Sequence, residues 1–416
     1  MKVVLVCHSD NNGGAAVVTY RLMNGLRRAG IDASMLVYTR YLQDSNVHLI
    51  SSRLERGVRF VLERVGIMRH NGFNRENLFK VSTASYGVDI SSHPLVREAD
   101  VVLLAWVSQG LFSFKALDRL HRMNKPIVWV MHDMWCMTGI CHHALGCENF
   151  TGECGNCKFL GFKASPDDLS HRVWKRKNEA YSRVPITFVA VSSWLAEMAG
   201  KSSLLRDKPV EVIHNAFPIS TFNTVITPDR LPFGMRQDTR YILMGAARLD
   251  DPIKDLPLAV EALNIIFDEH PEVANTTMAV FFGSLRDNDA LSELRFPHIW
   301  VGRIKDQQTL RDVFAAGDVV ISTSTFECLP GTLIEGQASG CVPVSFGYDG
   351  RRDIITHKVN GYIARRGDAR DFADGIRWAL NARLDPEALH REVGERFAAD
   401  AIASKFIALF RRLLDR

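Results

Sequence analysis

Short apolar runs alternate with amphipathic stretches along most of the chain. The runs are rich in β-branched residues and are bounded by polar residues or glycine, a pattern typical of buried strands. Between them, apolar residues recur at three- and four-residue steps, which predicts helices. Strands that alternate with helices predict parallel sheets of the α/β class. The predicted strands lie in residues 2–8, 99–106, 125–131, 184–191, 208–217, 240–248, 276–284, 298–304, 317–323 and 341–345.

The pattern of alternating strands and helices occurs once in each half of the chain, which predicts two domains. A chain of 416 residues is too long for one ordinary core. A polar, proline-bearing connection follows the fifth strand, so we place the boundary near residue 218. The sequence predicts two doubly wound, Rossmann-like α/β domains, at 1–218 and 219–395. An amphipathic helix is predicted within the last segment, 396–416.

The stretch 321–345 carries the clearest chemistry. Its strand leads through a loop into a predicted helix, for which Thr332 is a good N-cap and Glu335 completes a capping box. A helix N-terminus at this place favours an anion such as a nucleotide phosphate. The carboxylates of Glu327 and Glu335 can accept hydrogen bonds from sugar and ribose hydroxyls. Alternatively, Glu335 only caps its helix and Glu327 is an ordinary loop acid.

Two cations bracket the loop after the first strand of the second half. Arg248 offers a planar fork and Lys254 a point charge, and together they can hold a diphosphate. The alternative is an ordinary cationic surface loop.

Two loops of the first half are further candidates. Gly13 and Gly14 lie between a strand and a helix, where backbone N–H groups can approach a phosphate or sugar. The spacing of a dinucleotide-binding fingerprint is absent, and a tight structural turn is the alternative. His132 follows a strand, at the end where open sheets bind ligands, and Asp133 either orients it or caps the next turn.

Five of the eight cysteines lie in the loop 136–157. Cys154 and Cys157 have C-x-x-C spacing, and Cys141 and Cys147 complete a set of four thiolates for a structural zinc ion. Cys136 is then the spare cysteine, and His142 and His143 are alternative ligands. The alternatives to a zinc site are free thiols, an occasional disulfide or an iron–sulfur cluster.

Composition and charge limit the classes of ligand and the cell compartment to be considered. Lys and Arg number 51 against 47 Asp and Glu, a mildly basic balance that suits acidic ligands but is far from that of a nucleic-acid-binding protein. No export signal or membrane-spanning run is evident, which predicts a cytoplasmic protein. Residues 51–70 predict a basic amphipathic helix, with an apolar stripe of Leu54, Val58, Val61, Leu62 and Val65. This helix either packs on the core or lies on an anionic membrane surface.

Four motifs, taken together, resemble the retaining glycosyltransferases of family 4. They lie at residues 13–16, 132–135, 245–255 and 326–336, each at the end of a predicted strand. The last contains two glutamates with seven residues between them, like the donor-sugar signature of that family. Asp255 departs from the pattern, because a glycine commonly follows the lysine there. The Cys-rich loop is similar to that of a subgroup of exopolysaccharide enzymes, including the colanic-acid type.

The resemblance implies the GT-B architecture, in which two such domains face each other and the terminal helix crosses back to the first. It implies transfer of a hexose from a UDP- or GDP-linked sugar to a glycan or lipid-linked acceptor with retention, in polysaccharide biosynthesis. The first domain would be on the acceptor side and the second would bind the nucleotide sugar. No metal would be needed for catalysis, and association with the inner membrane surface would suit a lipid-linked acceptor. A nucleotide-sugar epimerase and a non-catalytic assembly protein are the alternatives.

The resemblance also implies roles for particular residues. His132 would lie by the donor sugar, Arg248 and Lys254 would bind the diphosphate, and Glu327 would hold sugar hydroxyls. The remaining substrate-binding residues would be Gly13, Gly14, Cys328, Leu329, Gly331, Thr332 and Glu335.

Overall fold

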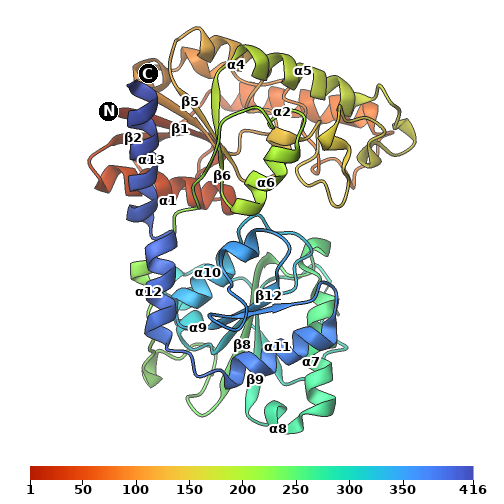
Figure 1. Cartoon of the computed structure of the whole chain (residues 1–416), viewed down its shortest axis with the longest axis vertical. Helices are drawn as coiled ribbons and strands as arrows, with labels where there is room; N and C mark the ends of the chain where they lie inside the picture. Colours follow the sequence, from red (N-terminus) through yellow and green to blue (C-terminus); the bar gives the residue numbers. More distant parts are fainter. Residues whose placement is uncertain (288, 416) are drawn as a thin grey trace. The chain divides into compact units, whose positions relative to one another are not determined.

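The computed structural model describes residues 1–287 and 289–415 and divides into two compact units (Figure 1). The first unit combines Met1–Ala216 with Ala399–Arg416, and the second is Phe217–Ala398. The last helix, α13 (Ala399–Leu414), packs against α1 (Gly14–Arg28) in the first unit. Arg416, the last residue of the segment predicted to carry this helix, lies outside the described residues.

A seven-stranded parallel sheet in the order β3-β2-β1-β4-β5-β6-β7 forms the first unit. Two of its strands, β2 and β3, were not predicted, since β2 mixes Asp32, Ser34 and Thr39 with its apolar residues. The strands are β1 (Lys2–Ser9), β2 (Asp32–Thr39), β3 (Val47–Leu49), β4 (Val101–Leu104), β5 (Ile127–Met131), β6 (Ile186–Ala190) and β7 (Val210–Val212). Its other helices are α2 (Arg53–His70), α3 (Pro94–Glu98), α4 (Phe114–His121), α5 (Leu169–Arg183) and α6 (Ser193–Lys201).

The second unit is built on a six-stranded parallel sheet in the order β10-β9-β8-β11-β12-β13. The strands are β8 (Arg240–Arg248), β9 (Thr277–Ser284), β10 (His298–Trp300), β11 (Val319–Ser322), β12 (Val342–Phe346) and β13 (Tyr362–Ala364). The helices are α7 (Leu256–Glu269), α8 (Pro271–Ala274), α9 (Gln307–Ala315), α10 (Gly331–Ala338), α11 (Ala369–Asn381) and α12 (Pro386–Phe397). The predicted class, two doubly wound α/β units, is confirmed.

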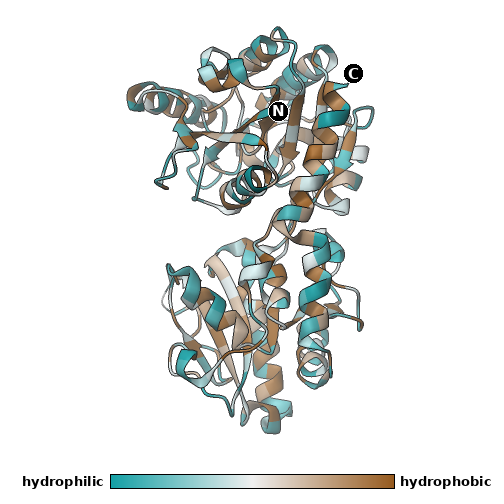
Figure 2. Ribbon diagram, turned by 90° about the vertical axis from the view of Figure 1, so that its left-hand side faces the viewer, coloured by the Kyte–Doolittle hydropathy of each residue, from teal (hydrophilic) through white to brown (hydrophobic). Residues whose placement is uncertain are grey.

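The core of each unit lies between its sheet and the helices that cover it. The central strands β4, β5, β6, β11 and β12 are buried along their whole length, as strands covered on both faces must be. Hydrophobic residues follow the strands, while hydrophilic residues gather on the outer helix faces and loops (Figure 2). The sheet order reverses direction beside β1 in the first unit and beside β8 in the second. Ligands of open α/β sheets bind at such switch points, beyond the carboxyl ends of the strands.

Helix α2 does not bury the apolar stripe that its sequence suggests. Leu54, Val58, Val61, Leu62 and Val65 are 39–78% exposed, so the expectation of a core-packed apolar face is wrong for this helix. Its buried positions are Glu63, Arg64 and Ile67. These charged side chains can be buried because they bind backbone.

The two charged residues fasten α2 to the segment that follows it. The Glu63 carboxylate accepts hydrogen bonds from the backbone N–H groups of Thr83 and Ala84. The Arg64 guanidinium donates to the carbonyls of Leu78 and Val81. These bonds, with an ion pair of 3.5 Å between Arg64 Nη2 and Glu63 Oε2, offset part of the cost of desolvating the two charges and hold this face of α2 inward.

Candidate functional site

The switch point of the second unit brings Arg248, Lys254 and Glu327 to one edge of the sheet. Arg248 ends β8, and Lys254 ends the short turn that follows it. Glu327 lies in the loop after β11, the strand that pairs with β8. The turn and the loop are joined by hydrogen bonds, because the Thr323 hydroxyl donates to the Lys254 carbonyl and the Thr325 N–H donates to the Ile253 carbonyl, both at 2.8 Å.

Lys254 and Glu327 form an ion pair, with 2.6 Å between Nζ and Oε1. Their side chains are 29% and 17% exposed, so the pair is only partly open to solvent. Burial acts to raise the pKa of Glu327, but the Lys254 ammonium, together with Ser324 and Arg351, outweighs it, and the pKa lies below its ordinary value. Glu327 is therefore a carboxylate at neutral pH, and it can accept hydrogen bonds from hydroxyl groups.

Arg248 lies against two aspartates that follow it in sequence. Its Nη2 is 2.8 Å from the carboxylate of Asp251, and its Nε is 3.6 Å from that of Asp250. The side chain is 27% exposed. An anionic ligand would compete with Asp251 for this guanidinium, so the two aspartates hold the fork in place and limit its affinity for anions.

Helix α10 starts where a phosphate site was predicted, but its cap differs from the prediction. The N-cap is Pro330, no side chain caps the helix, and Gly331 is the first helical residue. Thr332 is therefore inside the first turn and Glu335 beyond it, so the predicted capping box is wrong. Pro330 has no hydroxyl to satisfy the first N–H groups, which are the groups an anion would bind. The resemblance-based roles of Gly331, Thr332 and Glu335 do not depend on the cap.

An arginine–aspartate pair behind Glu327 was not predicted from the sequence. Arg351 is fully buried and binds Asp349 through two contacts, Nε to Oδ1 at 2.8 Å and Nη2 to Oδ2 at 2.7 Å. The Asp349 carboxylate also accepts from the backbone N–H of Glu327 at 2.8 Å. The pair therefore holds the backbone of the Glu327 loop. No sequence pattern pointed to this role, which became evident only from the tertiary structure.

Gly350 lies between these two residues and allows the loop to approach. A Cβ atom there would overlap the carbonyl oxygen of Cys328. Cys328 is half-buried, and the side chain of the next residue, Leu329, is buried. The Glu327–Leu329 loop thus rests directly on the backbone of residue 350.

In the first unit, Gly13 and Gly14 lie beyond the carboxyl end of β1. Gly13 has a φ of 94°, which favours glycine, and both residues are exposed. A Cβ atom on either would meet nothing within 4 Å. The turn leading to them is held by Ser9, whose hydroxyl accepts hydrogen bonds from the N–H groups of Asn11 and Asn12. The start of α1 is thus an open helix N-terminus.

His132 follows β5 directly and lines a small pocket of the first unit. The pocket is also lined by Thr19 of α1, His214 and Phe406 of α13. Burial lowers the pKa of His132 to about 4, against a smaller effect of Asp133 in the opposite direction. The imidazole is therefore neutral at physiological pH and can act as a hydrogen-bond donor and acceptor.

Asp133 binds other partners, so the first of its two alternative roles, orienting His132 through a hydrogen bond, is not the one it has. Its carboxylate accepts from the indole N–H of Trp106 at 2.7 Å, from the Trp135 N–H at 2.8 Å and from His142 Nδ1 at 2.7 Å. The bond to the Trp135 N–H fits the alternative role, capping of the next turn. Burial acts to raise the pKa of Asp133, but His142, together with His143 and the Trp135 N–H, outweighs it and the pKa is strongly lowered.

His142 links the Cys-rich loop to this carboxylate. Its other nitrogen, Nε2, lies 3.0 Å from the Ser82 hydroxyl, so both ring nitrogens are engaged. Hydroxyl, imidazole and carboxylate thus follow one another as in a hydrolytic triad. Ser82 is fully buried, however, so it cannot act as a nucleophile on an external substrate.

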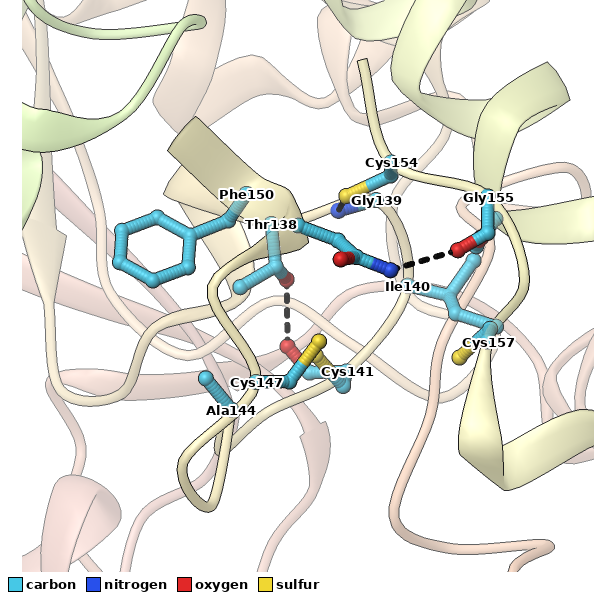
Figure 3. A pocket seen from close by; sticks show the side chains of 12 residues that line it. Thr138, Gly139, Ile140, Cys141, Ala144, Cys147, Phe150, Cys154, Gly155 and Cys157 are labelled. Carbon is cyan, nitrogen blue, oxygen red and sulfur yellow. Dashed lines mark hydrogen bonds between the residues drawn. The ribbon is translucent and has the colours of Figure 1, made fainter. Parts of the chain in front are cut away.

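The four predicted metal ligands lie together. Cys141, Cys147, Cys154 and Cys157 all line one small cavity of the first unit (Figure 3). In residues 1–287 and 289–415, no group of three or more His, Cys, Asp or Glu side chains meets the geometry of a metal site. The cysteines are not paired as disulfides.

Two doubly wound parallel sheets of this topology match the GT-B architecture of glycosyltransferases. Two sequence families support this: the model described as "Glycosyltransferase Family 4" matches residues 12–220, and "Glycosyl transferases group 1" matches residues 240–382. The chain belongs to glycosyltransferase family 4.

Individual relatives are distant. WcaC of Escherichia coli (strain K12), whose provisional name is colanic acid biosynthesis glycosyl transferase, is 22% identical over 154 residues. The match spans 36% of this chain and 38% of the length of that curated relative.

Solved structures share the fold over nearly the whole chain. Anabaena Alr3699/HepE, in complex with UDP and glucose, is 16% identical with a TM-score of 0.61, covering 99% of this chain and 100% of that chain. A glycosyltransferase from Rickettsia africae ESF-5 is 14% identical with a TM-score of 0.65, covering 100% and 99%.

Within the described part of the chain, none of the helices has the length and apolar composition required to cross a membrane.

Proposed function

We propose that this protein transfers a hexose from a UDP- or GDP-linked sugar to a hydroxyl of a glycan or lipid-linked glycan during polysaccharide biosynthesis. The observation that carries the proposal is the ion pair of Lys254 and Glu327, because it places a cation suited to a diphosphate beside a carboxylate suited to sugar hydroxyls at one switch point. Alr3699/HepE, which shares the fold, was crystallised with UDP and glucose. WcaC, matched over part of its length, is provisionally named for polysaccharide biosynthesis.

The leaving group of this reaction is a nucleoside diphosphate, whose developing charge must be stabilised. Arg248 and Lys254 supply two positive charges, and the N–H groups of Gly331 and Thr332 supply an uncapped helix start. Glu327, with the N–H groups of Cys328 and Leu329, holds the sugar hydroxyls, and Glu335 holds the ribose.

The first unit contributes the acceptor side in this proposal. His132 acts as a neutral hydrogen-bonding group toward the sugar, and Gly13 and Gly14 allow phosphate or acceptor to approach the start of α1. The anomeric configuration is retained by front-face attack, in which the leaving phosphate takes the acceptor proton. No protein nucleophile is required.

Calorimetry with UDP, GDP, ADP and their common sugars tests the donor assignment. A ligand that binds only the folded protein raises its stability as the logarithm of its concentration, so the true donor shifts the melting temperature most. We expect one nucleotide to bind, and to lose binding in Lys254→Met. If every nucleotide fails to bind the wild-type protein, the transferase proposal is overturned.

Product analysis then separates transfer from epimerisation. The donor found by calorimetry is incubated with glycan acceptors, and the anomeric configuration of the product is read by NMR. An α-linked donor sugar should give an α-linked product. Conversion of the donor to an epimeric sugar nucleotide without acceptor would instead identify an epimerase.

The protein is also proposed to work at the cytoplasmic face of a membrane. The exposed apolar stripe of α2 is accompanied by the exposed basic residues Arg53, Arg69, Arg75 and Lys80. Apolar side chains that insert between lipids and cations that meet anionic head groups together favour binding to an anionic surface. Such a location would bring the enzyme to a lipid-linked acceptor.

Catalysis itself is proposed to need no metal, since Arg248, Lys254 and the start of α10 can offset the charge of the leaving diphosphate. A zinc ion is proposed for the Cys-rich loop alone, in a structural role.

A further inference from the structure

The Cys-rich loop folds so that cysteines from separate parts of the loop line one cavity. Cys141 and Cys147 come from one turn of the loop and Cys154 and Cys157 from another, and all four line the same cavity (Figure 3). Cys136, the fifth cysteine of the loop, is buried and is not among the lining residues. The fold thus separates four cysteines from the fifth.

Both turns adopt backbone conformations that bend the chain tightly around the cavity. In the C-x-x-C turn, Cys154, Gly155 and Asn156 have φ values of 55°, 129° and 47°. The turn before Cys147 has φ values of 48° at Leu145 and 80° at Gly146. Left-handed conformations at residues other than glycine are strained, and they persist where the surrounding structure requires them.

Backbone groups already point toward the sulfurs. The N–H of Gly139 donates a hydrogen bond to Cys154 Sγ at 3.2 Å. Such bonds stabilise negative charge on sulfur, as thiolate ligands of a metal require. The turns are braced independently of sulfur, since Thr138 donates to the Cys141 carbonyl at 2.6 Å and Asn149 donates to the Gly155 carbonyl at 2.8 Å.

A buried lysine lies near the cluster. Lys177 of α5 is fully buried, and its ammonium donates to the carbonyls of Trp135 and Thr138 at the start of the loop. It lies within electrostatic reach of Cys141 and Cys154. Four thiolates around a divalent ion leave a net charge of about −2, which a buried cation would partly offset.

We propose that Cys141, Cys147, Cys154 and Cys157 bind one zinc ion, and that this metal holds His142 against Asp133. Zinc with four thiolates is a closed, structural site. Metal binding would draw the four sulfurs around the cavity into a tetrahedron. His142 directly follows the first ligand, Cys141, so closing the site fixes the imidazole that holds Asp133 beside Trp106. Asp133 in turn follows His132, so the metal would stabilise the carboxyl end of β5.

Zinc binding and its link to His142 are both tested without measuring activity. Neither result therefore depends on the proposed transfer reaction. Metal content is therefore measured first, on the full-length protein purified under reducing conditions. We expect about one zinc ion per chain, released when an organomercurial blocks the thiols. Replacement by Co²⁺ should give the intense visible bands of a tetrahedral thiolate site. Protein with no bound zinc that also takes up no Co²⁺ would overturn the proposal.

Single substitutions then identify the ligands. Cys157→Ser should lose most of the bound zinc, whereas the matched control Cys136→Ser should keep it, because Cys136 lies outside the cavity. Loss of zinc in both variants or in neither would overturn the assignment of ligands. If Cys157→Ser does not fold, Cys147→Ser takes its place in the same comparison.

A separate measurement tests whether the metal holds His142 in place. The ring resonances of His142, assigned by comparison with His142→Gln, should shift when zinc is removed and return when it is restored. Unchanged resonances would show that the metal does not hold His142. A protein that binds zinc but no nucleotide would overturn the proposed transfer reaction and leave the metal site intact.

Discussion

At the scale of single residues, the pairing of Lys254 with Glu327 is the contact on which the proposed chemistry depends. Lys254 keeps Glu327 ionised, each side chain orients the other, and each has a partner in the proposed donor. Both side chains are partly exposed, so solvent can reach either one when its partner is removed. Substitutions here should therefore affect binding and catalysis much more than folding.

Glu327→Ala should lower kcat/KM for transfer by at least about 100-fold, the effect of losing several kcal/mol of transition-state stabilisation. The free energy of unfolding should change by about 1 kcal/mol or less, because the side chain is at the surface of the site. Steady-state kinetics and urea unfolding measure the two effects. Glu272→Ala, on the exposed start of α8, is the control. Near-normal transfer by Glu327→Ala would remove Glu327 from the site.

His132 should make the protein sensitive to acid. Its pKa is lowered to about 4 in the folded state, below the ordinary value near 6.5, because burial disfavours the charged ring. The unfolded chain therefore binds the proton first, and this contribution to stability is present above pH 6.5 and is lost as pH falls toward 4.

Urea unfolding of His132→Gln across this range tests the effect. The wild-type protein should lose roughly 2–3 kcal/mol more than the variant between pH 7 and pH 4. His8, whose burial also lowers its pKa to about 4, remains in both proteins and contributes equally. Equal pH dependence of the two proteins would show that His132 is not buried as a neutral ring.

At the scale of elements, the site depends on how closely neighbouring segments approach. Asp255 has a φ of 50° and a ψ of 51°, a left-handed conformation that glycine adopts without strain. This explains why a glycine is common at this position in the family. Aspartate is among the residues that tolerate the conformation, so the departure leaves Lys254 in place.

Gly350→Ala should displace the loop that carries Glu327, because the added Cβ would overlap the Cys328 carbonyl. We expect donor affinity to fall at least about tenfold, with a loss of roughly 1–3 kcal/mol in unfolding free energy. Gly200→Ala is the matched control, since a Cβ there meets nothing within 4 Å and α6 should gain about 0.5–1 kcal/mol. Unchanged donor binding in Gly350→Ala would show that the loop moves freely.

The outward stripe of α2 should bind anionic membranes. The wild-type protein should float with vesicles that contain phosphatidylglycerol and less with neutral vesicles, and added salt should weaken binding. The double substitution Val58→Glu and Val61→Glu should abolish flotation. Val225→Glu and Val359→Glu, at valines of the second unit that are even more exposed, are controls. If the α2 variant instead changes a dimer into a monomer without affecting flotation, the stripe binds a second copy.

At the scale of the whole molecule, the chain closes its first unit with its last helix. Phe406 and Phe410 of α13 are buried in the first unit, and Ala399 and Ala403 approach Gly25 of α1 closely. Residues almost 400 positions apart thus share one core. The stability of the first unit therefore depends on the end of the chain.

Phe410→Ala should destabilise the first unit by roughly 3–5 kcal/mol through the cavity it leaves. Hydrogen exchange should show lost protection in α1 and β1, while β9 and α7 keep theirs. Phe372→Ala, which removes a fully buried ring of α11, should produce the reverse pattern. The same loss of protection in both units for both variants would show that they unfold as one.

The sequence by itself determined the α/β class, most of the buried strands and the residues at their carboxyl ends. Arg248, Lys254 and Glu327 could be predicted because hydrophobic runs mark strands and the loops that follow them carry the chemistry. The four cysteines that line one cavity could be chosen because their spacing along the chain is a local property. These features depend on residues near one another in the chain.

Only the tertiary structure decided which groups meet and which faces are buried. Lys254 and Glu327 pair because β8 and β11 are neighbours, and Arg351 supports their loop because it is buried beneath it. Helix α2 turns its apolar stripe outward because Glu63 and Arg64 find backbone partners inside. Thr332 is no cap because α10 begins at Gly331. The hydrophobic pattern of a helix or strand indicates how much apolar surface it has. The segments that pack against that helix or strand determine whether this surface is buried or exposed.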